Sequence, residues 1–229
     1  MTRKDSVNIH GFEMPATERH FQEVVSPPSV SNKYGSYQFE RLRAATKLCK
    51  PRRTALDVGG HVGLWAKHLC RYFKQVVSFE PNPNILPYYR VNMAAELQTG
   101  RAVLNDFGLS NVTGTLDLVY VPDNTGSTHV RESDEEADPA FVSVVAMRRL
   151  DDLELPPIDF IKIDCEGYEE FVLRGGERTI RANKPVIVVE QKAKYSGKYR
   201  TAKNSAGDLL IRWGMRLHAK MYGDLIMRW

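Results

Sequence analysis

Residues 54–63 read Thr54-Ala-Leu-Asp57-Val-Gly59-Gly60-His61-Val-Gly63, and residues 77–81 read Val77-Ser-Phe-Glu80-Pro81. The first stretch has the pattern of a strand, a glycine-rich turn and the start of a helix, and the second is a strand that ends in an acid. A carboxylate about twenty residues beyond such a turn can accept hydrogen bonds from the two hydroxyls of a ribose. The two stretches together therefore predict a binding site for a cofactor that contains a nucleoside.

The spacing of the glycines bears on which cofactor is bound. Dinucleotide-binding turns have glycine at the first, third and sixth positions, so that bare backbone can approach a pyrophosphate. Counted from Gly59, the third position is His61 and the sixth is Leu64, so side chains stand where a pyrophosphate needs backbone. The spacing instead favours S-adenosylmethionine (SAM), which has no phosphates and whose amino-acid tail would lie across the turn while its ribose reaches Glu80. The predicted cofactor-binding residues of these two stretches are Asp57, Gly59, Gly60, His61, Gly63, Glu80 and Pro81.

Length and composition favour one domain in a reducing compartment. The chain has 229 residues, which is enough to bury a core without disulfides or metals. Its three cysteines, Cys49, Cys70 and Cys165, have neither paired nor zinc-type spacing. The first residues lack the apolar run of a signal peptide, and no run of about 18 apolar residues could span a membrane. We therefore expect a soluble cytoplasmic protein with no membrane partner, whose net charge of +4 permits an anionic partner without requiring one.

Strands alternate with helices along most of the chain, which is typical of an α/β fold with a parallel sheet. The expected strands cover residues 55–58, 76–79, 102–106, 159–164 and 186–190, and the expected helices cover residues 37–48, 62–73, 85–97, 170–182 and 205–213. Two closing strands, 216–222 and 225–229, are joined by Gly223-Asp224, which predicts a tight antiparallel hairpin. A parallel sheet that ends in such a hairpin is the arrangement of class I methyltransferases. We therefore predict a Rossmann-like fold with a mostly parallel seven-stranded sheet and helices on both faces.

Two segments depart from this alternation. Residues 1–36 contain three prolines and weak periodicity, so we expect an irregular N-terminal extension that covers the cofactor site. Residues 112–147 are rich in turn signals and include an acidic run, which predicts an inserted pair of strands with a loop. The remaining residues, 37–229, are expected to form a single catalytic domain.

Three motifs, in this order, resemble the FkbM family of SAM-dependent methyltransferases. They are the turn Asp57-Val-Gly-Gly-His-Val-Gly63, then Phe79-Glu80-Pro81, then Ile161-Lys-Ile-Asp164-Cys-Glu166-Gly167-Tyr-Glu169 with Leu173-x-Gly175-Gly. The likeness covers residues 54–191 and extends weakly into the terminal hairpin. The sequence departs from the family at His61, where asparagine is usual, and at Arg149, where threonine is usual. The compact size and the ending Gly-Asp-Leu-Ile-Met-Arg-Trp are similar to those of small members encoded by bacteriophages.

Carboxylates gather where ligands bind in an open α/β sheet, at the carboxyl ends of the strands. Six fall at or just beyond such ends, namely Asp57, Glu80, Asp106, Asp164, Glu166 and Glu190. Asp106 and Phe107 are predicted to meet the adenine of the cofactor. Methyl transfer from a sulfonium is an in-line displacement, and a hydroxyl acceptor must also lose its proton. We predict that Asp164 or Glu166 takes that proton and that Asp164 also contacts the cofactor, although both acids could also cap the following helix.

Three further residues have both a structural and a functional interpretation. Lys162 lies inside an apolar strand, where it is either paired with an acid or in contact with the substrate. His61 is either a catalytic general base or a residue that only hydrogen-bonds to backbone. Cys165 is predicted to be a buried structural cysteine, because the Pro-Cys pair of covalent cytosine methylation is absent.

The mechanism and the acceptor each leave an alternative open. Asp164, Glu166 and Glu190 could bind a divalent ion that orients the hydroxyl and lowers its pKa, but we predict direct base catalysis and no metal. The family resemblance implies a hydroxyl acceptor, commonly on a sugar or polyketide, and so a small molecule or glycan as partner. Lys162, Glu190 and Lys192 are predicted to contact this acceptor.

A basic loop permits a nucleic acid or nucleotide-linked acceptor as a second hypothesis. Residues 192–203 contain Lys192, Lys194, Lys198, Arg200 and Lys203 together with Tyr195 and Tyr199. Such residues can follow phosphates and stack on bases, although a solvated loop has the same composition. The sequence at 164–168 lacks the Asp-Pro-Pro-Tyr motif, which argues against an exocyclic amine as acceptor. An NAD-linked oxidoreductase and an inactive SAM-fold binding module are the hypotheses from other classes.

Overall fold

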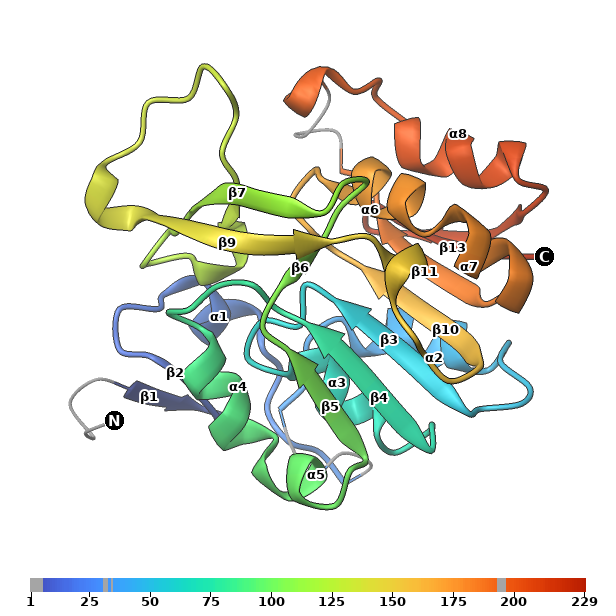
Figure 1. Ribbon diagram of the computed structural model, residues 1–229. Coiled ribbons are helices and arrows are strands. Elements are labelled where there is room, and N and C mark those ends of the chain that lie inside the picture. The colour runs from blue at the N-terminus through green and yellow to red at the C-terminus, as the bar shows by residue number, and fades with distance from the viewer. Residues whose placement is uncertain (1–5, 31–32, 34, 193–196) are drawn as a thin grey trace.

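The computed structural model describes residues 6–30, 33, 35–192 and 197–229. Its largest element is a seven-stranded sheet with the order β12-β13-β11-β10-β3-β4-β5 (Figure 1). Its strands are β3 (Thr54–Val58), β4 (Gln75–Phe79), β5 (Ala102–Asn105), β10 (Ile158–Ile163), β11 (Val186–Glu190), β12 (Arg216–Met221) and β13 (Asp224–Arg228). The five strands from β11 to β5 pair in parallel, whereas β13 is antiparallel to both β11 and β12. The predicted sheet, mostly parallel with an antiparallel C-terminal hairpin, is confirmed.

The C-terminal hairpin turns one residue earlier than the sequence predicts. Its two-residue link is Tyr222-Gly223, because Met221 pairs with Asp224 across the hairpin. Both link residues have positive φ, 52° and 97°, as a type I′ turn requires. Asp224 is thereby placed inside β13, directly opposite Glu190 of β11.

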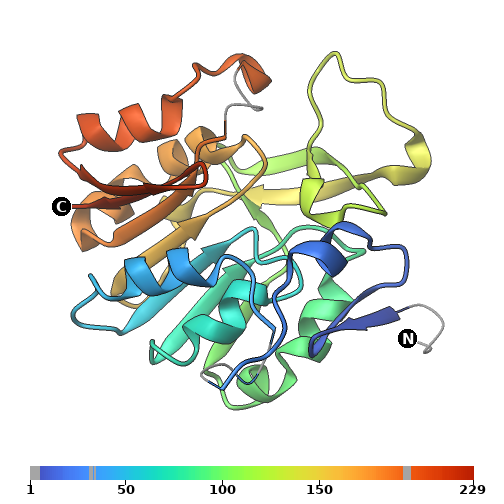
Figure 2. The same cartoon turned by 180° about the vertical axis from the view of Figure 1, so that it is seen from behind.

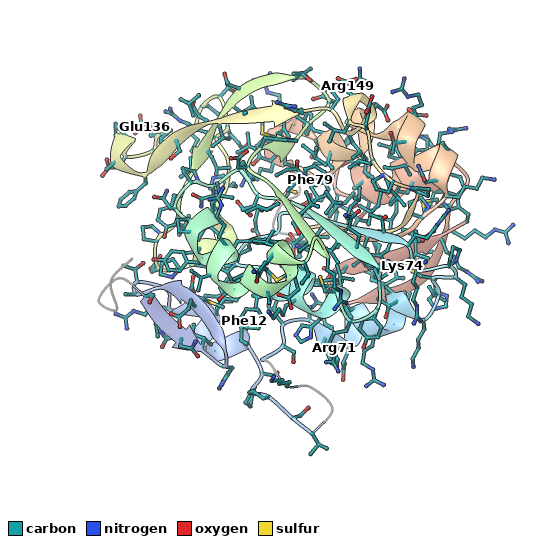
Figure 3. The ribbon with its side chains drawn as sticks, turned by 60° about the horizontal axis from the view of Figure 1, so that its bottom comes forward. Phe12, Arg71, Lys74, Phe79, Glu136 and Arg149 are labelled. Atoms are coloured by element: carbon teal, nitrogen blue, oxygen red, sulfur yellow. The ribbon has the colours of Figure 1, made fainter. Side chains whose placement is uncertain are left out.

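Helices cover both faces of the sheet, so its strands read as nearly continuous apolar runs (Figure 2). One face carries α2 (Phe39–Thr46), α3 (Leu64–Leu69), α4 (Leu86–Asn92) and α5 (Ala94–Gln98), and the other carries α6 (Glu169–Gly175), α7 (Glu177–Asn183) and α8 (Ser205–Arg212). Alternate residues of a strand point to opposite faces, so Ala55 packs with the first set of helices and Leu56 with the second. Figure 3 shows Phe79 inside the molecule, whereas Arg71 and Lys74 lie on its surface.

Two helices that the sequence predicts as continuous are interrupted. Residues 85–97 form α4 and α5, and residues 170–182 form α6 and α7, with Gly176 between the second pair. A Cβ on Gly175 would lie 1.9 Å from the backbone oxygen of Ser110, so glycine permits a close backbone contact where α6 ends. No helix in the described ranges is long and apolar enough to span a bilayer.

Residues 112–147 contribute most of a second, smaller sheet. Its strands are β6 (Gly108–Leu109), β7 (Gly114–Val119), β8 (His129–Val130) and β9 (Val142–Arg148), in the order β6-β9-β7-β8. Short 3-10 helices are η1 (Thr125–Ser127), η2 (Pro139–Phe141), η3 (Leu150–Asp152) and η5 (Lys198–Arg200). The sheet has four strands rather than the predicted pair, because β6 precedes the segment and β8 lies within the expected loop. Buried Leu118 and Met147 share a core with Phe79, which attaches this sheet to the same face as α6.

The N-terminal segment is structured, and the prediction of an irregular extension over residues 1–36 is wrong for much of its described part. Its elements are β1 (Ser6–Ile9), β2 (Phe12–Pro15) and α1 (His20–Val24). The two strands form an antiparallel hairpin. Phe12 and Phe21 are buried in one cluster with Val62 and Ile85. Burial of these apolar side chains stabilises the segment against the start of α3 and α4 despite its prolines.

Candidate active site

The candidate site lies where the strand order of the large sheet reverses. β3 is flanked by β10 on one side and β4 on the other, so the loops that follow these strands separate and open a crevice at their carboxyl ends. A pocket in this crevice is lined by the glycine turn, by residues after β4 and β10, and by parts of the N-terminal segment and the second sheet. The predicted site residues in its lining are Gly59, Gly60, His61, Glu80, Pro81, Lys162, Asp164 and Glu166.

The glycine turn packs tightly against the end of β10. The N–H groups of Gly59 and Gly60 both donate to the carbonyl of Phe79, at 3.0 and 3.1 Å. Gly59 has a φ of +76°, and a Cβ at this position would lie 2.1 Å from the carbonyl oxygen of Asp164. Only glycine combines this conformation with this contact. Glycine at position 59 therefore allows the turn to lie directly against the backbone at Asp164.

Glu80 is buried at the end of β4 and is oriented by two backbone groups. Its Oε2 accepts a hydrogen bond from the N–H of His61 at 2.7 Å, and its Oε1 accepts one from the N–H of Asn82 at 2.9 Å. Burial raises the pKa of Glu80 above its ordinary value, and the two backbone hydrogen bonds reduce that rise. Each oxygen keeps a second lone pair, so the carboxylate can still accept hydrogen bonds from two ribose hydroxyls.

Lys162 joins two acids beneath the glycine turn. Its Nζ donates to the carbonyl of Gly59 at 2.9 Å and lies 3.5 Å from Asp57 Oδ1 and 3.8 Å from Asp164 Oδ2. Burial lowers the pKa of Lys162, but Asp164 and Asp57 more than offset this effect, so the net pKa is raised and the ammonium stays charged. These contacts are those of a structural cation that fixes the turn, and contact with a substrate stays a prediction. Asp57 and Gly63 lie outside the pocket lining.

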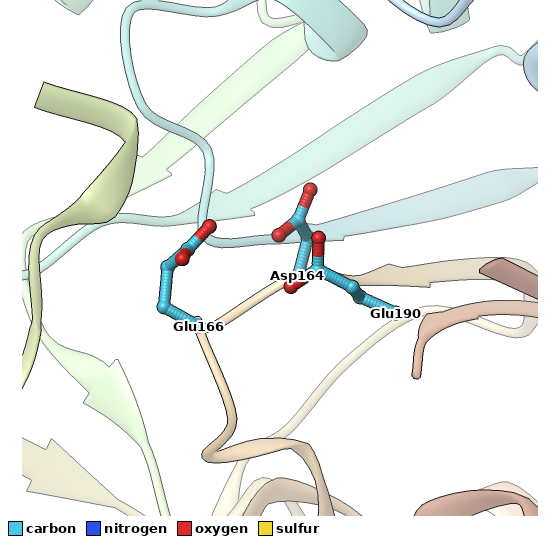
Figure 4. Close-up of side chains that lie close together, drawn as sticks. All are labelled: Asp164, Glu166 and Glu190. Carbon is cyan, nitrogen blue, oxygen red and sulfur yellow. The ribbon is translucent and has the colours of Figure 1, made fainter. Parts of the chain in front are cut away.

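Three carboxylates converge at the ends of β10 and β11. Asp164, Glu166 and Glu190 each bring an oxygen within 4.8 Å of the other two (Figure 4). Glu190 is buried and ion-paired with Lys192. Burial, followed by the charges of Asp164 and Glu166, raises the pKa of Glu190 well above its ordinary value. Carboxylate oxygens in such a group suit a hard divalent cation, so these are the residues that could hold one, and they could equally accept a proton from a hydroxyl.

A more open groove adjoins the pocket. Tyr37 lines both cavities, and Lys192 and Tyr222 line the groove. Burial raises the pKa of Tyr37 to about 12, so its hydroxyl stays protonated. Lys192 connects the groove to the carboxylates, because it is the ion partner of Glu190.

Glu169 holds the loop that carries these acids. In the sequence it stands out only as the last residue of the motif 161–169. Its Oε1 accepts hydrogen bonds from the N–H groups of Cys165 at 2.9 Å and Gly167 at 3.1 Å. Glu166, between them, has a φ of +55°, in the left-handed region that residues other than glycine rarely adopt. Burial raises the pKa of Glu169 to about 7, an effect that these backbone hydrogen bonds reduce. The Glu169 carboxylate therefore stabilises the turn at Glu166.

His61 is held by two segments that are distant in sequence. Its Nε2 lies 2.7 Å from the hydroxyl oxygen of Thr125, and its ring stacks on Phe21 with 4.7 Å between the centroids. Burial lowers the pKa of His61 to about 3, so the imidazole is neutral near pH 7 and a poor proton acceptor. The interpretation of His61 as a general base does not agree with this environment, which the sequence of the turn alone does not reveal. Contact with the cofactor stays a prediction.

Comparison with known families agrees with this geometry. A sequence profile described as the Methyltransferase FkbM domain matches residues 57–214, well over half of the chain. The chain belongs to the FkbM methyltransferase family. The resemblance predicted from the three sequence motifs is therefore confirmed.

Two curated proteins are similar to this FkbM methyltransferase over part of their length. Hexuronic acid methyltransferase AglP of Haloferax volcanii is 26% identical over 132 residues, covering 58% of this chain and 53% of AglP. Methyltransferase sdnD of Sordaria araneosa is 27% identical over 152 residues, covering 52% of this chain and 59% of sdnD. The chain thus spans little more than half the length of these relatives.

A solved structure shows the same fold. The crystal structure of methyltransferase FkbM from Methylobacillus flagellatus matches with a TM-score of 0.51 and 19% identity, covering 77% of this chain and 43% of that one. The predicted class I methyltransferase fold is confirmed by this match together with the sheet order.

The predicted adenine contacts of this FkbM methyltransferase lie outside the pocket lining. The Asp106 side chain is 68% exposed, and Arg90 lies 3.9 Å away. Phe107 packs against Phe79, with 5.8 Å between the ring centroids. β5 ends at Asn105, one residue before the predicted end, and the first residues of β6 line the pocket instead. Residues 105–107 lie beside Phe79 and Glu80, and contact of Asp106 and Phe107 with adenine stays a prediction.

The described part of the basic loop is bound to the second sheet. The hydroxyl of Tyr199 donates to the carbonyl of Val130 at 2.6 Å, and its N–H donates to Glu132 at 3.1 Å. The Tyr199 ring also lies edge-on to Tyr168, with 5.2 Å between the centroids. The ring is therefore packed within the protein, which weakens the nucleic-acid hypothesis. Two predicted members, Lys194 and Tyr195, lie outside the described residues.

Sequence reasoning missed the residues that cover the pocket of the FkbM methyltransferase. Phe21, Tyr37 and Thr125 line it, and buried Glu18 contacts Thr125. None of them belongs to a motif, and Thr125 lies 64 positions from His61. Their place in the site follows from tertiary contacts, so only the expectation that the N-terminal segment covers the site pointed towards them.

Proposed function

We propose that this FkbM methyltransferase uses SAM and transfers its methyl group to a hydroxyl oxygen of a sugar-like acceptor. The proposal rests on one observation, that Glu80 and Asp164 line the same pocket where the strand order reverses. Glu80 would hold the ribose, and Asp164 would act on the acceptor. The glycine turn between β3 and α3 would support the remainder of the cofactor.

The residues of the pocket fit SAM. Gly59 lets the turn pack directly against the backbone after β10, and the Glu80 carboxylate is already oriented by two N–H groups. Bound SAM would supply an electrophilic methyl group. The turn and Glu80 would fix the cofactor so that the acceptor oxygen can approach in line, which is the main contribution of an enzyme to such a displacement.

Asp164 is the proposed general base. It lies at the end of β10, partly exposed to the pocket, and the charged Lys162 ammonium is 3.8 Å from its Oδ2. The acceptor hydroxyl would give its proton to Asp164 as the methyl group is transferred. Glu190, whose carboxylate is ion-paired with Lys192, would help to position the acceptor beside Asp164.

A divalent cation held by Asp164, Glu166 and Glu190 is the second mechanism, supported by the 4.8 Å grouping of their oxygens. The Lys192 ammonium already lies beside Glu190 and would compete with a metal for it. We therefore favour direct base catalysis. Methyl transfer should continue after treatment with EDTA, and loss of activity that Mg²⁺ restores would support the metal mechanism instead.

The acceptor class is supported by one relative. The similar protein AglP is named a hexuronic acid methyltransferase, which supports a sugar-like acceptor for this chain. The groove beside Tyr37 is lined by aromatic and hydrogen-bonding side chains, the combination that small polar ligands require for orientation. Tritium transfer from labelled SAM into separate glycan, small-molecule and nucleic-acid fractions would identify the acceptor. Label in nucleic acid alone would contradict the proposal.

Thermal unfolding with added ligands tests the cofactor. S-adenosylhomocysteine (SAH), the product form of SAM, should raise the melting temperature in proportion to the logarithm of its concentration, because it binds the folded state. NAD⁺ at the same concentrations should have no effect. Stabilisation by NAD⁺ alone would favour an oxidoreductase and overturn the proposal.

The variant Asp164→Asn tests the base. It should retain SAH binding but lose roughly a hundredfold or more in methyl transfer, because an amide cannot accept the proton. Asp208→Asn on the exposed side of α8 is the matched control and should transfer at the wild-type rate. Unchanged transfer by Asp164→Asn would remove Asp164 from the mechanism, and no transfer by any form would favour a binding module.

A further inference from the structure

A buried carboxylate connects the N-terminal segment to the second sheet. Glu18 is fully buried, and its Oε1 accepts a hydrogen bond from the N–H of Phe21 at 2.9 Å. Its Oε2 accepts hydrogen bonds from both the N–H of Thr125, at 2.8 Å, and the hydroxyl of Thr125. All three donors therefore point at Glu18, and the Thr125 hydroxyl uses its single hydrogen in the bond to that carboxylate.

This arrangement determines where the proton of His61 lies. A threonine hydroxyl has one hydrogen, so once it donates to Glu18 the Thr125 oxygen can only accept from His61. The Nε2 of His61, 2.7 Å away, must then carry a hydrogen. A neutral imidazole has a single N–H, which leaves a lone pair on Nδ1. The low pKa of His61 agrees with the neutral form.

The Nδ1 atom of His61 has no hydrogen-bond partner among the described residues, although it is buried. The Phe21 ring stacks on the imidazole, and the residue lines the cofactor pocket. A buried acceptor without a partner is unfavourable, and such groups in native proteins are usually satisfied by a ligand or water. Because His61 lines the pocket, a ligand bound there could supply this partner.

We propose that Glu18 and Thr125 fix His61 as the Nε2–H tautomer so that Nδ1 accepts a hydrogen bond from the ammonium group of the cofactor's amino-acid tail. His61 is then a cofactor-binding residue, and Glu18 and Thr125 are positioning residues that act through it. The inference rests on the proposed use of SAM. It also gives two segments a function in cofactor binding. The N-terminal segment supplies Glu18, and the connection between β7 and β8 supplies Thr125.

The tautomer can be observed directly by NMR. In protein labelled with ¹⁵N-histidine, two-bond ¹H–¹⁵N correlations should show His61 with a protonated Nε2 and an unprotonated Nδ1, and the spectrum of His61→Asn would assign the signal among the six histidines. Saturating SAH should shift the Nδ1 resonance. Methylthioadenosine, which lacks the amino-acid tail, should leave it in place. A protonated Nδ1 in the free protein, or an equal shift with both ligands, would overturn the inference.

Affinity measurements test the positioning role. Thr125→Val removes the hydroxyl and should weaken SAH binding about tenfold, the usual size of one lost buried hydrogen bond, and should let the His61 tautomer change. Thr125→Ser keeps the hydroxyl and should bind within about threefold of the wild type. Thr115→Val, at an exposed position of β7, is the control for the loss of a hydroxyl. Wild-type affinity and an unchanged tautomer in Thr125→Val would overturn the role of Thr125.

Failure of this inference can be distinguished from failure of the proposed function. If SAH binds tightly but the Nδ1 resonance does not move, the role of His61 is overturned while the cofactor assignment stands. If SAH does not bind to the wild type at all, the cofactor assignment fails and the role of His61 fails with it.

Discussion

The strand-end crevice and its cover differ in how their residues reach the pocket. The crevice, formed by residues 57–63, 80–82 and 162–169, supplies the carboxylates and the glycine turn from segments that each follow a strand of the large sheet. The cover, formed by the described parts of residues 12–37 and 108–147, supplies aromatic rings and a hydroxyl through contacts between distant segments. The comparison indicates that the crevice holds the chemical groups, whereas the cover encloses and orients them.

This contrast predicts that the substitutions with the largest effect on stability are those that alter the backbone of the crevice. Gly59→Ala would combine a strained φ with a Cβ 2.1 Å from the Asp164 carbonyl oxygen, so we expect a loss of about 4 kcal/mol or more in the free energy of unfolding. Gly100→Ala is the control, since it has a φ of +70° but no atom within 4 Å of the added Cβ. Gly100→Ala should lower the free energy of unfolding by only about 1 kcal/mol, which is the cost of the strained φ alone. Equal effects in urea unfolding would contradict the close contact.

One residue of the crevice, Glu169, should also make the free energy of unfolding depend on pH. The pKa of Glu169 is about 7 in the folded protein and ordinarily 4.5, so the folded state binds the proton more tightly than the unfolded state. Stability should therefore fall as the pH rises from about 4.5 to 7, by up to about 3 kcal/mol, and remain level above this range. Glu169→Gln cannot titrate and should flatten this interval in urea unfolding at several pH values. Glu177→Gln, on the exposed side of α7, should follow the wild type, and an unflattened curve for Glu169→Gln would argue against a raised pKa.

Loss of Glu80, the proposed ribose-binding acid, should reduce cofactor affinity strongly. Glu80→Ala removes hydrogen bonds from a charged acceptor, so SAH should bind roughly a hundredfold more weakly by isothermal titration calorimetry. Glu154→Ala, an exposed residue away from the pocket, should bind as the wild type does. Unaltered affinity in Glu80→Ala would mean that the ribose is held elsewhere.

Substitutions in the cover should have a smaller effect than those in the crevice, and this effect should appear in the rate at which the cofactor dissociates. Phe21→Ala removes the ring stacked on His61, and SAH should dissociate about tenfold faster because the enclosure is weakened. Phe141→Ala, at an exposed position of η2, serves as the control. Stopped-flow dissociation rates that are the same in all three proteins would show that Phe21 does not enclose the cofactor.

Particular elements illustrate what could be predicted. The end of β11 at Glu190 and the span of α8 were predicted to within a residue, because a short apolar run and an amphipathic pattern specify them locally. The split of residues 170–182 into two helices was missed, because it depends on the Ser110 backbone lying against Gly175. The hairpin over β1 and β2 was missed because its apolar residues were too few to show a period. The end of β5 was predicted one residue too late, at Asp106, because the alternation of the strand continues into the following turn.

The sequence by itself determined the fold class, the family and the crevice acids Glu80, Asp164 and Glu166, since strand-end position and motif spacing are local properties of the chain. Tertiary structure alone decided that Lys162 fixes the glycine turn, that Glu169 holds the Glu166 turn, and that His61 is neutral and held by Phe21 and Thr125. The physical reason is that pKa values and hydrogen-bond partners depend on groups brought close by folding. Glu18, Thr125 and His61 lie in three separate segments, and no pattern within any one of them encodes their contact.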